Sequence, residues 1–352
     1  MRLKEFITGY DFQQPYIRRP FIIAEAGVNH EGSMELAKRL IEEAKEGGAD
    51  AIKFQSYKAE TIASKDSPSY WDLNKEPTTS QYQLFRKYDK FWKNEFESLK
   101  KYCDKTGIEF ISTPFDIESA NFLNELMDVF KISSSDITNK PFIKHICSFG
   151  KPVMLSTGAS YLYEIEESAG WIKDSGNSLV LLHCVLNYPT KDINANLGMI
   201  IHLRSKFPGT IIGYSDHTLP KDMKTLEVAT LLGASVLEKH FTFDKTLPGN
   251  DHYHAMDKDD MKIFLKNVDN TFQLLGKFNI TSLPSEAPAR KNARRSLVAK
   301  RHIPSGKPVE FEDLTWKRPA SGISPRFIDE IIGKKAIINI NEDTVLQFNM
   351  FV

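Results

Sequence analysis

The sequence shows no excess of charge of either sign, because its 46 Lys and Arg residues balance its 46 Asp and Glu residues. Proteins dedicated to nucleic acids carry a basic surplus, so this composition argues against nucleic acid as a partner. No apolar run approaches the roughly 18 residues that a transmembrane helix needs, and the first residues lack the apolar core of a signal peptide. We therefore expect no membrane contact.

Cysteine is also scarce, with three residues in a chain of 352. Cys103, Cys147 and Cys184 lie far apart, are odd in number and form no Cys-x-x-Cys motif. This pattern argues against a disulfide framework and is typical of reduced thiols. Together, these absences predict a cytoplasmic enzyme or binding protein.

Short apolar runs alternate with amphipathic segments over the first three quarters of the chain. The runs comprise residues 21–28, 51–56, 109–115, 129–135, 152–158, 179–185, 210–217 and 235–241. Most are rich in Ile, Val, Leu and Phe, as in strands that are buried on both faces of a parallel sheet. Between them apolar residues recur at helical spacing, as in the helix that Ser33 caps and Gly47–Gly48 ends. Eight repeats favour an α/β fold of the (β/α)₈ TIM-barrel type over an open doubly wound sheet.

Three segments do not belong to this alternation. Residues 57–92 form an unusually long connection, which on a barrel would overhang the strand ends, and we interpret it as a lid. Residues 279–292 shift to Ser, Pro, Ala and charge, a composition typical of a linker. We therefore predict a barrel domain at 1–278, a linker, and a small domain at 293–352. Because about 60 residues fold only marginally alone, we expect the small domain to dock on another surface.

Every predicted strand ends in polar side chains that a buried strand does not need for its own packing. Burying an unpaired charge is costly, and the active sites of TIM barrels lie at the carboxyl ends of their strands. The polar residues at these ends are Glu25, Lys53, Gln55, Thr113, Lys131, Ser134, Ser156, Thr157, Asn187, Tyr188, Ser215, His217, Glu238 and His240. The sequence therefore predicts an active site at this end of the barrel.

These side chains fall into two chemical groups. One cation and several hydroxyl groups suit a phosphate or a carboxylate, and they are Lys131, Thr113, Ser134, Ser156 and Ser215. His217 and His240 end adjacent strands, so their imidazoles are placed to converge on a divalent metal. With Glu25 and water in its shell, Mn²⁺ fits such a site. His252 and His254 lie in the loop after the last strand, where we expect them to be exposed to solvent.

Seven segments carry a resemblance to a known family. Six lie at strand ends and one lies in the small domain: AEAGVNH at 24–30, IKFQ at 52–55, STPFD at 112–116, LSTG at 155–158, GYSDH at 213–217, EKHFT at 238–242 and KRPASGIS at 317–324. The first six resemble the sialic acid synthase family, which includes N-acetylneuraminate, legionaminate and pseudaminate synthases. The seventh resembles the antifreeze-protein-like (SAF) domain at the C-terminus of that family.

The resemblance implies a reaction and a set of roles. In that family, phosphoenolpyruvate condenses with the open-chain aldehyde of an N-acetylated sugar to give a nonulosonic acid and phosphate, the phosphate leaving by C–O cleavage. His217 and His240 would hold Mn²⁺ (or Mg²⁺ or Co²⁺), which polarises the aldehyde, and Glu25 would transfer protons. Phosphoenolpyruvate would bind to Thr113, Lys131, Ser134, Ser156 and Ser215. The sugar would contact Lys53, Gln55, Tyr188, Asp251 and, across the interface of a domain-swapped homodimer, Arg318.

The acceptor sugar is left open by departures from the family pattern. Residues 131–136 read KISSSD where the family usually has Pro-Ser-Gly-Glu, and Leu186 stands where members can have an asparagine. No role follows for Asp136, Asn187 or His254. The acceptor candidates are N-acetylmannosamine, its 6-phosphate and a diacetamido-trideoxy hexose.

Two other classes of function compete with a synthase. A metal-dependent barrel hydrolase generally has His-x-His at the end of the first strand, where this chain has AGVNH. A non-catalytic sugar-binding protein would be favoured by the loss of Glu25, His217 or His240, and all three are present. Both alternatives are therefore weaker than the synthase.

Overall fold

The structure is a computed structural model that describes residues 2–249 and 251–352. Its contacts divide the chain into two compact units, the first ending at Gly276 and the second comprising Lys277–Val352. Among the described residues, no helix has both the length and the apolar character to cross a membrane.

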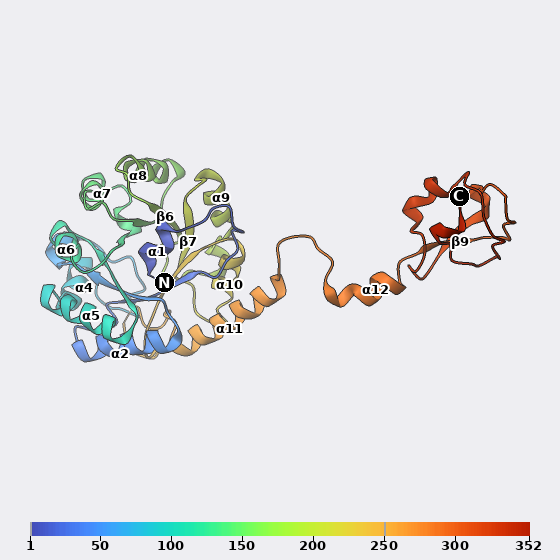
Figure 1. Ribbon diagram of the computed structural model, residues 1–352. Helices are drawn as coiled ribbons and strands as arrows, with labels where there is room; N and C mark the ends of the chain where they lie inside the picture. The colour runs from blue at the N-terminus through green and yellow to red at the C-terminus, as the bar shows by residue number, and fades with distance from the viewer. Residues whose placement is uncertain (1, 250) are drawn as a thin grey trace. The chain divides into compact units, whose positions relative to one another are not determined.

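The first unit is a barrel of eight strands surrounded by helices (Figure 1). The strands are β1 (Phe21–Gly27), β2 (Ala51–Ser56), β3 (Glu109–Pro114), β4 (Phe130–Ile132), β5 (Val153–Ser156), β6 (Leu179–Cys184), β7 (Ile211–Asp216) and β8 (Val236–His240). Their order is β3-β2-β1-β8-β7-β6-β5-β4, with parallel neighbours. The ends of this order, β3 and β4, pack against each other and nearly close the barrel. The predicted (β/α)₈ architecture is confirmed.

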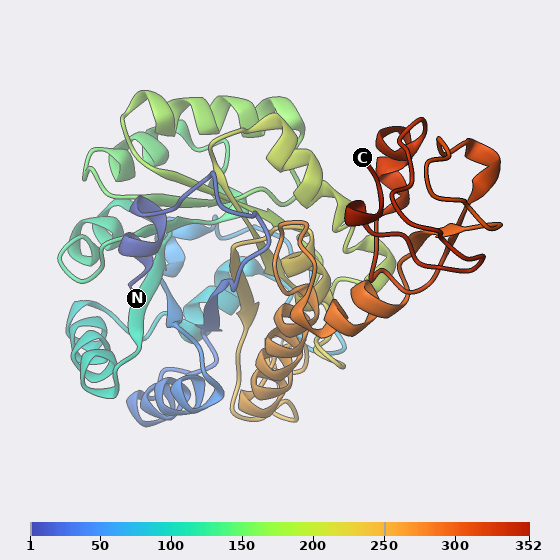
Figure 2. The same ribbon diagram turned by 45° about the vertical axis from the view of Figure 1, so that its right-hand side comes forward.

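The helices lie outside the strands, and α2 and α11 pack side by side in both views (Figures 1 and 2). The α-helices of this unit are α1 (Leu3–Thr8), α2 (Met34–Gly47), α3 (Ala59–Ile62), α4 (Gln81–Tyr88), α5 (Lys93–Thr106), α6 (Ile117–Leu123), α7 (Lys140–Cys147), α8 (Leu162–Asp174), α9 (Gly198–Lys206), α10 (Lys224–Leu231) and α11 (Lys258–Leu275), and the 3₁₀ helices are η1 (Ser134–Asp136) and η2 (Asp192–Asn194).

Local sequence signals explain where α2 begins and ends. The Ser33 hydroxyl accepts a hydrogen bond from the backbone N–H of Leu36, which satisfies one of the free donors at the helix start. Gly48 follows the helix with a φ of +95°, a conformation that glycine adopts without steric cost. Leu40 and Ile41 lie on the buried face between these caps. The helix is therefore fixed against the barrel along one apolar stripe.

Helix α1 lies at the amino-terminal end of the barrel. The backbone N–H of Leu3 donates to the carboxylate of Glu109, the first residue of β3, over 2.7 Å. The hydroxyls of Tyr10, which follows α1, and Ser235, which precedes β8, share a hydrogen bond of 2.8 Å. This end is therefore covered by the chain's own N-terminal segment, and the carboxyl ends of the strands are on the opposite side.

Strand β4 is shorter than the predicted apolar run 129–135. It ends at Ile132, and the following residues turn into η1. The Ser133 hydroxyl accepts a hydrogen bond from the backbone N–H of Ser135, so serine side chains compete here with the sheet for backbone partners. The strand consequently ends early, and Ser134 points back to the barrel, where its Oγ accepts the N–H of Gly158 over 2.9 Å.

The second unit has its own small apolar core, which includes Leu297, Ile303 and Leu346. Its strands β9 (Ser296–Ala299) and β10 (Leu314–Lys317) pair antiparallel. The helices are α12 (Ala287–Asn292) and α13 (Ile328–Ile331), with η3 (Pro284–Glu286), η4 (Phe311–Asp313), η5 (Pro325–Phe327) and η6 (Phe348–Met350). The apolar run at 336–340 forms isolated bridges at its two ends rather than a strand.

Candidate active site

The barrel brings most of the predicted site residues to the carboxyl ends of its strands. Strands β1, β2, β3, β4, β5, β7 and β8 carry, in that order, Glu25, Lys53 with Gln55, Thr113, Lys131, Ser156, Ser215 and His240. The residues just after strands β4, β6 and β7 include Ser134, Tyr188 and His217. All of them are buried except Gln55 and Tyr188, which are half-buried. Chain segments far apart in the sequence thus share one polar site.

Two lysines and two glutamates form the base of this site. The Lys53 Nζ lies 2.6 Å from Glu25 Oε2 and 3.7 Å from Glu238 Oε1. The Lys131 Nζ lies 3.6 Å from the same Glu238 oxygen, which also accepts the hydroxyl of Ser215 over 3.0 Å. Glu238 therefore holds both lysines in position. The sequence placed Glu238 at a strand end but gave no sign of this role.

The two carboxyl groups differ in their electrostatic surroundings. Burial raises the pKa of Glu25 to about 7, although the adjacent Lys53 opposes the shift. Burial also acts to raise the pKa of Glu238, but Lys131 and Lys53 outweigh it and lower this pKa to about 2. Pairs of carboxyl groups with separated pKa values divide structural and proton-transfer roles between them. Glu238 remains ionised, while Glu25 can gain or lose a proton near neutral pH.

Several hydroxyl and amide groups surround these charges. Lys53 Nζ donates to Thr113 Oγ1 over 3.1 Å, and Gln55 Nε2 donates to Glu25 Oε1 over 2.9 Å. The Ser156 Oγ is buried and has no hydrogen-bond partner among the described residues. A buried hydroxyl without a partner costs free energy, so its natural partner is a polar group of a ligand.

Histidines gather beside this charged base. The rings of His217 and His240 lie 5.4 Å apart between centroids, and those of His240 and His254 lie 4.9 Å apart. The Nδ1 of His217 donates to the carbonyl of Val185 over 2.7 Å, so Nε2 is the nitrogen left for a ligand. Burial lowers the pKa of His217 to about 4 and that of His240 well below its usual range. Both imidazoles are therefore neutral at pH 7, the form that binds metals.

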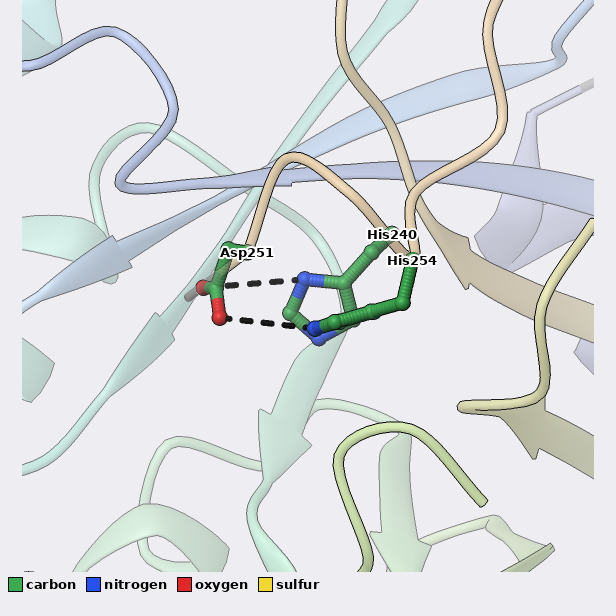
Figure 3. Close-up of side chains that lie close together, drawn as sticks. All are labelled: His240, Asp251 and His254. Carbon is green, nitrogen blue, oxygen red and sulfur yellow. Dashed lines mark ion pairs between the residues drawn. The ribbon is translucent and has the colours of Figure 1, made fainter. Parts of the chain in front are cut away.

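The carboxylate of Asp251 faces two of these histidines (Figure 3). Its Oδ2 is 3.7 Å from His240 Nδ1, and its Oδ1 is 3.7 Å from His254 Nε2. The candidate ligand atoms of the three residues all lie within 4.8 Å of one another. The arrangement offers two imidazoles and a carboxylate to one divalent cation.

The prediction that His252 and His254 are exposed is wrong, because their side chains are only 3% and 0% exposed. The loop that carries them folds back onto the end of β8, where the N–H of Met256 donates to the carbonyl of His240 over 2.8 Å. The Thr242 hydroxyl and His252 Nδ1 share a hydrogen bond of 2.8 Å. A loop tied to a strand at both of its ends buries side chains that sequence position alone would leave in solvent.

A cleft of about 400 Å³ lies beside these residues and is lined by both barrel and long-loop residues. Such a volume is within the range of small-molecule sites. The segment predicted to be a lid supplies Tyr57, Tyr70, Trp71 and Tyr88 to the lining, and Asp251 and His240 also face it. Among the described residues that line the cleft, none is a lysine or an arginine.

Three singled-out residues stand apart from the cluster. Arg318 belongs to the second unit, directly after β10, and is exposed. Asn187 is exposed as well. Asp136 is half-buried and lines the cleft, and burial raises its pKa.

The comparisons with known proteins show the family to which the chain belongs. The NeuB family is matched by residues 40–279, and the SAF domain by residues 294–352. The chain belongs to the NeuB family. This NeuB chain is 39% identical to the N,N'-diacetyllegionaminic acid synthase of Legionella pneumophila, over 93% of each chain. It is also 39% identical to the synthase of the same name from Campylobacter jejuni, over 94% of this chain and 100% of the relative.

A solved structure also resembles this NeuB chain. The N-acetylneuraminic acid synthetase of Leptospira borgpetersenii, in complex with citrate, is similar with a TM-score of 0.69 and 35% identity. The similarity covers 77% of this chain and 90% of that one. The NeuB and SAF matches bear out the resemblance that the strand-end motifs carry.

Proposed function

We propose that the chain condenses phosphoenolpyruvate with 2,4-diacetamido-2,4,6-trideoxymannose to give N,N'-diacetyllegionaminic acid and phosphate. The observation that carries the reaction is the buried cluster of Lys53, Lys131, Glu25 and Glu238 at the strand ends, next to a cleft of about 400 Å³. A synthase of the sialic acid type is the class of enzyme that the family membership supports.

Phosphoenolpyruvate fits the charged base of the site. Its phosphate and carboxylate need cations and hydroxyl donors, and the proposed partners are Lys131, Thr113, Ser134, Ser156 and Ser215. The Ser156 hydroxyl has no other partner among the described residues. Protonation of Glu25 leaves the four charged groups with a net positive charge, which favours an anionic ligand. Bound phosphoenolpyruvate would in turn hold that proton on Glu25.

The residues also fit a divalent metal, for which we propose Mn²⁺. His217 and His240 would hold it, because His217 keeps Nε2 for a ligand and His240 Nδ1 is buried without a hydrogen-bond partner among the described residues. When bound, the metal supplies Lewis-acid polarisation of the sugar aldehyde.

Glu25 would carry the proton transfers of the reaction. A bond forms between C3 of phosphoenolpyruvate and the aldehyde carbon, and protonated Glu25 donates its proton to the aldehyde oxygen. Water then adds to the oxocarbenium carbon C2, and the Glu25 carboxylate accepts the proton released. The C2–O bond to phosphate breaks last, while the C2 hydroxyl becomes the keto carbonyl and its proton passes to the leaving phosphate, so that the keto acid and inorganic phosphate are released. Gln55 and Lys53, which contact the two oxygens of Glu25, orient this carboxyl group.

The cleft supports a deoxy sugar without a phosphate group. Its described lining contains no lysine or arginine, so a phosphate on C6 would meet no cation among the residues that line the cleft in this chain. Aromatic side chains such as Tyr70 and Trp71 suit the methyl groups of two acetamido substituents and of a 6-deoxy carbon. Two of the relatives at 39% identity are named N,N'-diacetyllegionaminic acid synthases. N-acetylmannosamine is the second candidate acceptor.

Further sugar contacts would come from Lys53, Gln55, Tyr188 and Asp251, with Arg318 supplied by a second copy of the chain. In a domain-swapped homodimer, the exposed Arg318 of one copy would serve the cleft in the barrel of the other copy. The described lining of that cleft contains no lysine or arginine of its own. We propose that the enzyme works in the cytoplasm, where phosphoenolpyruvate is available.

A panel of acceptors tests the proposed function. Phosphate release is measured with phosphoenolpyruvate and Mn²⁺ in the presence of 2,4-diacetamido-2,4,6-trideoxymannose, N-acetylmannosamine or N-acetylmannosamine 6-phosphate. We expect the highest kcat/KM with the diacetamido sugar and the lowest with the phosphorylated one, and no release by the Glu25→Gln variant. A preference for the 6-phosphate would refute the acceptor assignment, and release without any sugar would refute the synthase.

A further inference from the structure

We infer that His254 is a third imidazole ligand of the divalent metal, joining His217 and His240. This inference rests on the metal site of the proposed function and changes its ligand set. His254 lies on the loop after β8, outside the strand-end motifs, and its side chain is 0% exposed.

The surroundings of the His254 ring favour a role as a metal ligand. Both of its nitrogens are buried, and neither has a hydrogen-bond partner within 3.5 Å among the described residues, although Nε2 faces Asp251 Oδ1 at 3.7 Å. An unsatisfied buried polar group destabilises the folded state, so a site that served packing alone would favour an apolar side chain. A buried imidazole whose nitrogens make no hydrogen bond is suited to a metal ion.

The orientation of the His254 ring also favours a role as a metal ligand. His254 and His240 both point toward the carboxylate of Asp251, from opposite ends of one loop (Figure 3). The Asp251 oxygens lie 3.7 Å from a nitrogen of each ring, and the ligand atoms of the three residues fit within 4.8 Å. Two ligands about 2.1 Å from one ion at tetrahedral or octahedral angles are about 3.0–3.4 Å apart. A small inward movement would therefore bring nitrogens of His240 and His254 onto one ion beside the Asp251 carboxylate.

The backbone fixes His254 in this position. Residues 241 and 256 form a parallel bridge, and the Thr242 N–H donates to the Met256 carbonyl over 2.9 Å. His254 is thus two residues from a backbone bridge that begins beside His240. A ligand on a tethered loop loses little conformational freedom when it binds, which favours tight binding.

A third imidazole changes which metals the site prefers. Imidazole suits Zn²⁺, Co²⁺ and Fe²⁺, whereas carboxylate and water suit Mg²⁺ and Mn²⁺. A site with three histidines should therefore discriminate strongly against Mg²⁺ and bind Co²⁺ more tightly than Mn²⁺. Removal of one imidazole should reduce the difference in affinity between Co²⁺ and Mn²⁺.

The test measures metal binding in the full-length protein after chelator treatment. Calorimetric titration with Mn²⁺ and with Co²⁺ compares the wild type with His254→Ala, His254→Gln and His217→Ala, and the exposed His202 on α9 supplies the control variant His202→Ala. We expect at least a tenfold rise in Kd for Co²⁺ in both His254 variants and no change in the control. Circular dichroism of the metal-free proteins checks that each variant is folded.

A nitrogen count gives a second readout that activity does not influence. Pulsed electron paramagnetic resonance of the Mn²⁺-loaded protein detects the ¹⁴N nuclei of bound imidazoles, and we expect three in the wild type and two in His254→Gln. Two in both proteins, with unchanged Kd values, would overturn the inference while leaving the site of His217 and His240 intact. Failure of the wild type to bind either metal would overturn the metal part of the proposed function as well.

Discussion

Replacing Glu25 by Gln should stabilise the barrel at alkaline pH while it abolishes turnover. The side chain is 2% exposed, and its folded-state pKa of about 7 lies well above its ordinary value of 4.5. Such a shift corresponds to about 3 kcal/mol. Because the folded-state pKa is raised, ionisation of Glu25 lowers the free energy of unfolding of the wild type. This loss is absent below pH 4.5, grows as the pH rises, and is complete above about 7. Lys53 retains Glu238 as a counter-charge, at 3.7 Å, after the substitution.

The assay is urea unfolding followed by circular dichroism at several pH values, since most of the helices lie in the barrel. Between pH 5 and pH 8 we expect the variant to gain about 2–3 kcal/mol in the free energy of unfolding relative to the wild type. Glu97→Gln, at an exposed position of α5, is the control, because it removes a carboxyl group without removing a buried charge. A difference that does not change with pH would refute the assignment of a raised pKa to Glu25.

Three further predictions concern catalysis, assembly and packing. Because protonated Glu25 is the proposed proton donor, kcat/KM of the wild type should fall as the pH rises through about 7. A wild-type rate that rises through that range would contradict the donor role. Mixing inactive Glu25→Gln and Arg318→Ala proteins after subunit exchange should restore about a quarter of wild-type activity, since one site of each hybrid dimer is intact; continued inactivity of exchanged dimers would count against the swap. Gly213→Ala should destabilise the barrel by more than about 1 kcal/mol, because a Cβ there would lie 2.4 Å from the backbone oxygen of Val236; an unchanged Tm would show that β7 can move aside.

The sequence was sufficient to predict the barrel, because strands buried on both faces leave continuous apolar runs. All eight runs contain a strand, and β4 and β5 are markedly shorter than their runs. In β4 the reason is that serine side chains bond the backbone. Strand β10 was missed. Its Leu314 is buried, whereas Trp316 and Lys317 are exposed, so no apolar run marks it.

The sequence predicted those site residues whose location follows from their position at the end of a strand. Strand ends converge in a barrel, so polar residues there could be assigned to one face without knowledge of side-chain contacts. The pairing of Glu238 with both lysines depends on distances across three strands, which no sequence pattern encodes. His254 was missed because its burial follows from the fold of a loop, and the spacing of Asp251 and His254 was the one available signal.

The proposed enzyme condenses phosphoenolpyruvate with a sugar and releases phosphate by breaking the bond between C2 and the bridging oxygen. The measurement that tests this reaction most directly uses phosphoenolpyruvate labelled with ¹⁸O at the bridging oxygen, together with Mn²⁺ and 2,4-diacetamido-2,4,6-trideoxymannose, and follows the label by mass spectrometry. We expect the label to appear in inorganic phosphate and phosphate release to require the sugar. A nonulosonic acid should form in the same amount as phosphate. Label retained in an organic product, or phosphate released without the sugar, would contradict the proposed reaction.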